Sequence, residues 1–309
     1  MKFFSSQDVV ALTPYKGLVP HLTDSLQSSC ISPSRLDLDV TGAGDALLIM
    51  PAWRPHGIVG VKLVTAYPNN TATKLPSISA VYVAFDAAHG QALAMIDGLT
   101  LTTRRTAAAS ALAMSRLLSK KAQRLAVIGT GSLCLDLIEA HNSAFPFTKT
   151  VLWGRTPDKA IQRAQQALER GFPIEAVADL REAVRDADCI VCATTSRKPF
   201  IFRSDLKPGA HVSLVGAFTR DMAELDPQAL SFVKLFADSR EAVLDKGGEV
   251  WQALRDGLIK PSAIAGELRD IAAPQFDFSR AETDITVWKS VGFAELDLIT
   301  AEMILNGRS

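Results

Sequence analysis

The sequence predicts an α/β fold with two domains, and three features of the chain indicate it. The apolar run Leu125–Ile128 leads into Gly129-Thr130-Gly131, a pattern typical of a buried strand that turns tightly into a helix. From residue 124 to about residue 240, strand-like and helix-like segments alternate, as in a parallel sheet covered on both faces. The residues before this part contain short runs typical of an antiparallel sheet.

The part of the chain before Arg124 is expected to begin with a helix over residues 6–28. Asp97-Gly98 is typical of a hairpin turn, and the Ala- and Leu-rich segment from Thr102 to Lys121 predicts a long helix. Alternating apolar residues, with Gly and Pro between the runs, predict strands at residues 46–50, 60–66, 80–86 and 92–97.

The part from Arg124 onward has the pattern of a parallel sheet, and its last stretch, 285–307, contains a short strand and then a helix. Strands are predicted at residues 124–129, 149–153, 188–193, 211–215 and 233–237, with helices at 157–170 and 178–186. Ligands of such sheets bind outside the carboxyl ends of the strands. We therefore expect a Rossmann-type dinucleotide-binding domain in this part of the chain.

Composition restricts the class of protein. Lys and Arg total 33 residues, as do Asp and Glu, so no excess of positive charge indicates a nucleic-acid partner. No apolar run approaches the ~20 residues of a membrane-spanning helix, and the first residues lack the features of a signal peptide. Four scattered cysteines are typical of a reducing compartment. We expect a cytoplasmic protein with neither a nucleic-acid nor a membrane partner.

Metal binding is not predicted. Cys189 and Cys192 lie three positions apart on an expected strand and therefore face opposite sides, which favours packing over a joint metal or redox role. The five histidines share no metal-ligand spacing.

The glycine turn indicates a nucleotide cofactor. Gly129 and Gly131 permit a tight turn, and Ser132 and Leu133 open a helix whose N-terminus would hold a phosphate. The next strand ends in Gly154-Arg155-Thr156, where the adenosine ribose is expected. A guanidinium and a hydroxyl there, without Asp or Glu, suit a phosphate monoester. NADPH is therefore favoured over NADH, the alternative being that Arg155 is only a solvated side chain.

Basic residues in apolar surroundings indicate an anionic ligand. Arg104 and Arg105 are expected in the first turn of a helix capped by Thr102 or Thr103, where positive charge opposes the helix dipole. A bound carboxylate or phosphate would compensate this positive charge, and we favour that interpretation for Arg105. For Arg104, a salt bridge to Asp97 is an equal alternative. Lys62 lies among apolar strand residues, and it either reaches solvent or forms a cation in a pocket.

The chain resembles the ornithine cyclodeaminase/mu-crystallin family over nearly its whole length. The resemblance is carried by six motifs in the order of the family, at residues 48–52, 60–65, 104–109, 127–131, 215–219 and 285–292. It implies that the final helix packs against the first domain and that two copies form a homodimer through that domain. We therefore expect a mixed α+β substrate-binding and dimerisation domain over residues 1–118 with 285–309, and the Rossmann NAD(P)-binding domain over 119–284.

The same resemblance assigns expected roles to particular side chains. Lys62 and Arg105 match the residues that bind the substrate carboxylate and serve catalysis, and Arg35 is expected to join them. Ser77, Thr195 and Ser290 lie where the family contacts its cofactor, and Val291 is expected beside the substrate.

One position departs from the cyclodeaminases, which carry an acidic residue two places after the glycine that ends the strand at 211–216. Here that residue is Phe218, so ornithine cyclodeamination is disfavoured. The segment resembles the branch that reduces Δ1-pyrroline-2-carboxylate and Δ1-piperideine-2-carboxylate to L-proline and L-pipecolate. Phe218 would then be an apolar wall, and Thr219 is expected to hydrogen-bond the ring nitrogen.

Two alternatives to this cyclic imine (ketimine) reductase stay open. An amino-acid dehydrogenase of the alanine type would use the same cations and cofactor on open-chain 2-oxo acids. An NADPH-binding carrier of the mu-crystallin type would need the same glycine turn without turnover.

Overall fold

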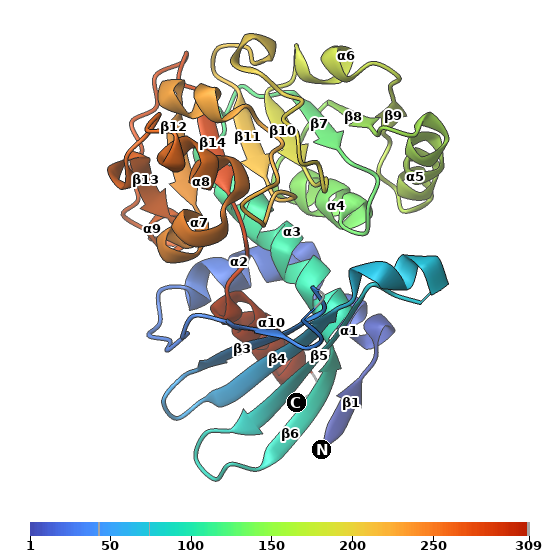
Figure 1. Ribbon diagram of the computed structural model, residues 1–309, viewed down its shortest axis with the longest axis vertical. Coiled ribbons are helices and arrows are strands. Elements are labelled where there is room, and N and C mark those ends of the chain that lie inside the picture. Colours follow the sequence, from blue (N-terminus) through green and yellow to red (C-terminus); the bar gives the residue numbers. More distant parts are fainter. Residues whose placement is uncertain (43, 74, 308–309) are drawn as a thin grey trace. The chain divides into compact units, whose positions relative to one another are not determined.

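The computed structural model describes residues 1–42, 44–73 and 75–307, which form two compact units (Figure 1). Unit 1 consists of Met1–Thr106 with Phe293–Ser309, and unit 2 of Ala107–Gly292. The helix α3 (Gly98–Leu117) begins in unit 1 and ends in unit 2. The strand β14 (Thr286–Lys289) belongs to unit 2, not to the N-terminal domain as expected, because it pairs with strands of that unit on both sides.

Unit 1 is built on a mainly antiparallel sheet, in which the described residues form six strands in the order β1-β6-β5-β4-β3-β2. β1 is parallel to β6, and the other neighbours are antiparallel. The four predicted strands are confirmed, and the sequence interpretation missed β1 and β2. The strands are β1 (Lys2–Phe4), β2 (Leu36–Asp39), β3 (Ala46–Trp53), β4 (Ile58–Ala66), β5 (Ile78–Asp86) and β6 (Ala92–Asp97).

The predicted helix over 6–28 is wrong as a single helix, because the structure has α1 (Ser6–Leu12) and α2 (Tyr15–Ser25). Proline disfavours helical backbone in the residue before it, and Pro14 has the extended torsions of an N-cap. A further helix of the unit, α10 (Ala294–Asn306), packs on β3, β4 and α2, as the family resemblance implied.

The predicted hairpin turn at Asp97-Gly98 is also wrong, since Gly98 is the first residue of α3. Asp97 accepts a 2.8 Å hydrogen bond from the N–H of Thr100 and so caps the helix in place of Thr102 or Thr103. Arg104 and Arg105 consequently lie beyond the first turn, where the helix dipole has little effect on them.

The two faces of the sheet in unit 1 differ. Met50, Lys62 and Tyr82, which face the helices, are at most 5% exposed. Their strand neighbours point to the other face, are only half-buried and are almost all apolar. We call this second surface the open face of the sheet: Ile49, Val61, Leu63, Val81, Val83 and Met95.

Unit 2 is built on a parallel sheet, and its described strands lie in the order β13-β12-β14-β11-β10-β7-β8-β9. This arrangement confirms the Rossmann-type fold. The remaining strands are β7 (Arg124–Ile128), β8 (Lys149–Trp153), β9 (Glu175–Ala176), β10 (Cys189–Cys192), β11 (His211–Leu214), β12 (Lys234–Ala237) and β13 (Ile264–Glu267). The helices are α4 (Cys134–Ala144), α5 (Pro157–Glu169), α6 (Leu180–Val184), α7 (Arg240–Lys246), α8 (Gly248–Arg255) and α9 (Leu268–Ala272).

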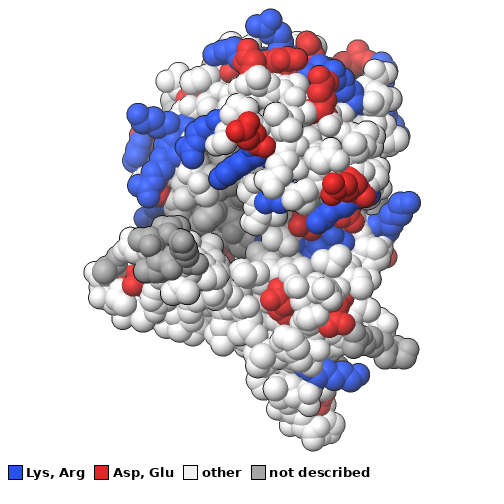
Figure 2. Space-filling view, turned by 90° about the vertical axis from the view of Figure 1, so that its right-hand side faces the viewer, with Lys and Arg blue, Asp and Glu red and all other residues white. Residues whose placement is uncertain are grey.

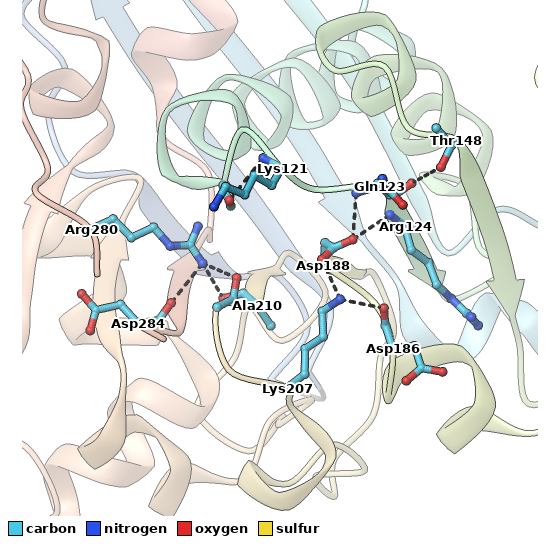
Figure 3. A network of polar contacts seen from close by, with 12 residues as sticks. Lys121, Gln123, Arg124, Thr148, Asp186, Asp188, Lys207, Ala210, Arg280 and Asp284 are labelled. Atoms are coloured by element: carbon cyan, nitrogen blue, oxygen red, sulfur yellow. Dashed lines mark hydrogen bonds and ion pairs between the residues drawn. The ribbon is translucent and has the colours of Figure 1, made fainter. Parts of the chain in front are cut away.

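Polar contacts fix the amino ends of these strands (Figure 3). The Asp188 carboxylate accepts 2.8 Å hydrogen bonds from the N–H groups of Gln123 and Arg124, and it pairs with the Lys207 ammonium at 2.6 Å. Arg280 donates to the carbonyl groups of Ala210 and Asp284. These contacts join segments at the amino ends of the strands, whereas ligands of such sheets bind outside the carboxyl ends.

Charge on the surface and cysteines in the interior were both considered in the sequence. The charged side chains visible in Figure 2 are of both signs. Cys189 and Cys192 are completely buried free thiols, which agrees with a packing role. None of the described helices is both long and apolar enough to cross a membrane.

Candidate active site

Three elements of unit 1 bring together Lys62, Arg105 and Asp297, from β4, α3 and α10 respectively. The Lys62 ammonium lies 2.7 Å from one oxygen of Asp297, and Nε of Arg105 donates to the other oxygen at 3.0 Å. Lys62 is 1% exposed, Arg105 5% and Asp297 completely buried. We call these three residues the cationic cluster, because two buried positive charges share one carboxylate.

The cationic cluster is suited to binding an anion. Burial lowers the pKa of Lys62 to about 8; Asp297 opposes this effect, while the charges of Arg105 and Arg35 add to it. Arg105 uses only Nε within the cluster, and its two terminal nitrogens donate to no described residue. A carboxylate binds such a pair of parallel N–H groups in bidentate fashion. An anionic ligand would also balance the second positive charge of the cluster.

The other predicted cations have different surroundings. Arg35 lies just before β2, 3.1 Å from the Asp37 carboxylate, and its charge reaches Lys62. The guanidinium of Arg104 stacks at 3.6 Å on the ring of Tyr15 and donates to the hydroxyl of Thr13. Arg104 therefore joins α3 to the segment between α1 and α2, which is a structural role.

Sequence interpretation missed Asp297. Its one indication is a carboxylate within the apolar segment Leu296–Ile299, since a buried carboxylate requires a partner. It also missed Tyr82, which lies opposite Lys62 on the neighbouring strand β5. The Tyr82 hydroxyl occupies the space over Gly60, where a Cβ atom would lie 1.6 Å from the oxygen. Gly60 in the motif at 60–65 thus makes room for this ring.

The glycine turn of unit 2 has the geometry expected for a phosphate-binding turn. Gly129 has φ +122°, and a Cβ atom there would lie 2.5 Å from the carbonyl oxygen of Ala193. At Gly131 a Cβ atom would meet no described atom within 4 Å, so the space beside it is open. The N–H groups of residues 130–133 donate to no described residue, and they immediately precede α4. Ser132 and Leu133 are thus placed to offer backbone N–H groups to a pyrophosphate.

The end of β8 also leaves polar groups available. Gly154 packs against Thr130, where a Cβ atom would lie 2.4 Å from the Thr130 methyl group. Arg155 and Thr156 are exposed, and Thr156 occupies the N-cap of α5 without a capping hydrogen bond from its side chain. A guanidinium, a hydroxyl and a helix N-terminus therefore coincide at this point.

The remaining predicted residues lie near the ends of strands. Ser77 precedes β5 in unit 1, and Thr195 is exposed after β10 in unit 2. The Ser290 hydroxyl and the Val291 N–H, which follow β14, both donate to the carboxylate of Asp238. Ser290 therefore uses its hydroxyl hydrogen within the protein.

The loop after β11 carries Phe218 and Thr219. Phe218 is 38% exposed and offers an apolar surface without an acidic group. The Thr219 hydroxyl donates a 2.6 Å hydrogen bond to the exposed Asp221. In this arrangement the hydroxyl is able to accept a further hydrogen bond, but not to donate one.

Comparisons with known proteins extend over both units. The ornithine cyclodeaminase/mu-crystallin family model matches residues 4–308. A Δ1-pyrroline-2-carboxylate reductase of Paracoccus denitrificans is 35% identical over 258 residues, which cover 82% of this chain and 80% of the relative. A reductase of the same name from Bacillus cereus is 35% identical over 278 residues, covering 89% and 85%. The structure of Thermococcus litoralis Δ1-pyrroline-2-carboxylate reductase in complex with NADH and L-proline has a TM-score of 0.93 at 29% identity, covering 99% of this chain and 97% of that one.

Proposed function

The chain belongs to the ornithine cyclodeaminase/mu-crystallin family, and we propose from this that it is an NAD(P)H-dependent reductase of cyclic imines. Its proposed substrates are Δ1-pyrroline-2-carboxylate and Δ1-piperideine-2-carboxylate, reduced to L-proline and L-pipecolate. The observation that carries the proposal is the buried cationic cluster, which is suited to a small carboxylate. The two reductases that are 35% identical to this chain support it.

The proposed reaction needs few groups from the protein. The terminal nitrogens of Arg105 and the Lys62 ammonium would bind the substrate carboxylate, with Arg35 as a further cation. The reduced nicotinamide, when bound, supplies the hydride that adds to the carbon of the protonated C=N bond. The products are then the secondary amine and the oxidised cofactor. Because the imine nitrogen is protonated before hydride arrives, an apolar residue such as Phe218 is compatible with the reaction.

The proposed cofactor is NADPH, with NADH as the alternative. Residues 130–133 fit a pyrophosphate, and Arg155 with Thr156 would bind the additional phosphate on the ribose. The proposal assigns the further cofactor contacts to Ser77, Thr195 and Ser290, and it places Val291 and Thr219 beside the substrate. A cytoplasmic location is part of the proposal, supported by cysteines that are all free thiols.

The direct test is to follow absorbance at 340 nm with NADPH and Δ1-pyrroline-2-carboxylate. We expect rapid cofactor oxidation, faster with NADPH than with NADH at the same concentration. Pyruvate with ammonia is the control substrate, because an alanine-type dehydrogenase would prefer it. Absence of oxidation with either imine and either cofactor contradicts the proposal, and tight NADPH binding without turnover would favour a carrier protein.

We further propose that two copies associate through the open face of the sheet in unit 1. Monomers rarely leave a broad apolar surface exposed, and the side chains of this face are half-buried in a single chain.

Val83→Glu places a charge at the centre of the open face and is expected to convert a dimer into a monomer in light-scattering measurements. Val10→Glu is the matched control, because Val10 on α1 is 49% exposed and lies off the sheet. A wild-type protein that has the mass of one chain at micromolar concentration would contradict the proposal.

A further inference from the structure

A buried carboxylate connects the ends of β10 and β11. The two oxygens of Glu224 accept hydrogen bonds from the N–H of Thr194 at 2.6 Å and from the N–H of Gly216 at 2.9 Å. Thr194 and Gly216 follow these adjacent strands, and Glu224 is completely buried. A Cβ atom at Gly216 would lie 2.0 Å from the carbonyl oxygen of Thr194 and 2.4 Å from Glu224. Only glycine allows the two strand ends to share this carboxylate.

A second carboxylate connects the ends of β12 and β14. One oxygen of Asp238 accepts from the Ser290 hydroxyl at 2.7 Å, the Val291 N–H at 2.9 Å and the Gly292 N–H at 2.6 Å. The other oxygen accepts from the N–H of Ser239 at 2.8 Å. Asp238 is 2% exposed, so these donors replace the water that a carboxylate requires. We call Glu224 and Asp238 the bridging carboxylates.

The strands joined in this way are neighbours in the order β12-β14-β11-β10. Lys289, at the end of β14, forms a 3.1 Å ion pair with Glu249 at the start of α8, and both side chains are completely buried. Burial raises the pKa of Glu224 to about 7; Glu249 adds to this effect and Lys289 opposes it. The neighbouring Cys192 thiol stays neutral, because burial raises its pKa as well.

The position of these four strand ends indicates which half of the cofactor would bind beside them. A dinucleotide lies across the point where the strand order of a doubly wound sheet reverses, which here is between β7 and β10. The glycine turn after β7 and Arg155 after β8 suit the adenosine half. The ends of β10, β11 and β14 are consequently left for the nicotinamide half.

We propose that Glu224 and Asp238 are positioning residues for the nicotinamide half of the cofactor. Glu224 holds the loops 194–196 and 216–219 at fixed spacing, because it accepts backbone N–H groups from both. Asp238 holds the loop 290–292 at the end of β12, because it accepts the N–H groups of Val291 and Gly292. The inference rests on the proposed function, since it takes a nicotinamide dinucleotide as the ligand. It adds two residues that act through the backbone and not by contact with the substrate.

An amide is a suitable replacement in the test, because it keeps the size and removes one acceptor. In Glu224→Gln the amide NH₂ would face an N–H donor of Thr194 or Gly216, so one connection is lost. Asp238→Asn has the corresponding effect on β12 and β14. Glu175→Gln is the matched control, since Glu175 is an exposed residue of the same unit.

The measurement compares NADPH with 2′-phospho-ADP-ribose, a fragment that lacks the nicotinamide. We expect Glu224→Gln and Asp238→Asn to bind the fragment within about twofold of wild type. We expect kcat, and the ratio of NADPH affinity to fragment affinity, to fall by about tenfold or more, in line with a lost buried hydrogen bond. Glu175→Gln should leave all three quantities unchanged.

A pH series adds a measurement that a merely structural role would not change. Protonation of Glu224 near pH 7 places a hydrogen on one of its two acceptor oxygens. The ratio of NADPH to fragment affinity in wild type is therefore expected to fall between pH 8 and pH 6, and to be flat in Glu224→Gln. If that variant fails to fold and binds no fragment, the inference is tested by the pH series on wild type and by the measurements on Asp238→Asn.

The inference would be overturned if both variants fold and have the kcat and the affinity ratio of wild type. It would also be overturned if Glu224→Gln does not fold and the affinity ratio of wild type does not change with pH. Either outcome would leave the proposed function intact. Wild-type protein that binds no nicotinamide nucleotide would overturn both.

Discussion

Asp297→Asn is expected to reduce kcat/KM for Δ1-pyrroline-2-carboxylate by about 100-fold or more, mainly through KM. Without the carboxylate, Lys62 and Arg105 are two like charges in a buried site, and breaking a buried ion pair costs about 3–5 kcal/mol. Asp297 is also the group that opposes the effect of burial on Lys62, so its removal lowers the pKa of Lys62 below about 8. At neutral pH the lysine would then lose the charge that binds the substrate.

The pH dependence of KM separates this explanation from simple unfolding. In wild type, KM should rise as the pH increases through about 8, because the Lys62 ammonium loses its proton there. In Asp297→Asn the same rise should occur at lower pH. Glu302→Gln is the control, since Glu302 lies on the same helix and pairs with Arg54 at 3.2 Å. An unchanged KM and pH profile in a folded Asp297→Asn protein would contradict the proposed role of the cationic cluster in the mechanism.

Arg105→Ala is expected to reduce kcat/KM by about 1000-fold, because two hydrogen bonds to a carboxylate and one charge are lost together. Arg105→Lys should recover only part of the loss, since an ammonium cannot replace the pair of parallel N–H groups. The dissociation constant of NADPH, measured by fluorescence titration, should change by less than about twofold in both variants.

The control for Arg105 is Arg116→Lys. Arg116 lies on the same helix but donates to the carbonyl groups of Ile271 and Ala273 in unit 2. If Arg105→Lys were as active as wild type, the bidentate interaction with the substrate would be contradicted. A large loss of NADPH affinity in Arg105→Ala would instead place this residue in the cofactor site.

Local patterns predicted much of the fold. Glycine spacing after an apolar run was sufficient to predict the turn between β7 and α4. Period-two alternation was sufficient to predict the strands β3, β4, β5 and β6. Where a single residue changes the local preference, prediction failed: Pro14 divides the first helix, and Asp97 caps a helix where a hairpin turn was expected. These outcomes depend on backbone torsions and hydrogen bonds, which residue types specify only weakly.

Long-range contacts explain what the sequence could not indicate about the candidate site. Lys62 and Arg105 matched a family pattern, but their shared partner lies 192 positions from Arg105. Glu224 lies outside the motif at 215–219, and its two acceptor bonds depend on how β10 and β11 lie side by side. A sequence shows that a charged residue lies among apolar ones, but not which donor it meets.

The position of β14 has a consequence for the synthesis of the chain. This strand follows β12 and β13 in the chain, yet it lies between β11 and β12, so the sheet of a nascent polypeptide has a gap in its middle until residues 286–289 have been synthesised. Asp297 follows β14 directly and reaches its partners in unit 1 equally late. Sheet closure in unit 2 and charge neutralisation in the cationic cluster therefore both require residues that are synthesised after β13, and nascent intermediates will expose apolar strand edges that attract chaperones.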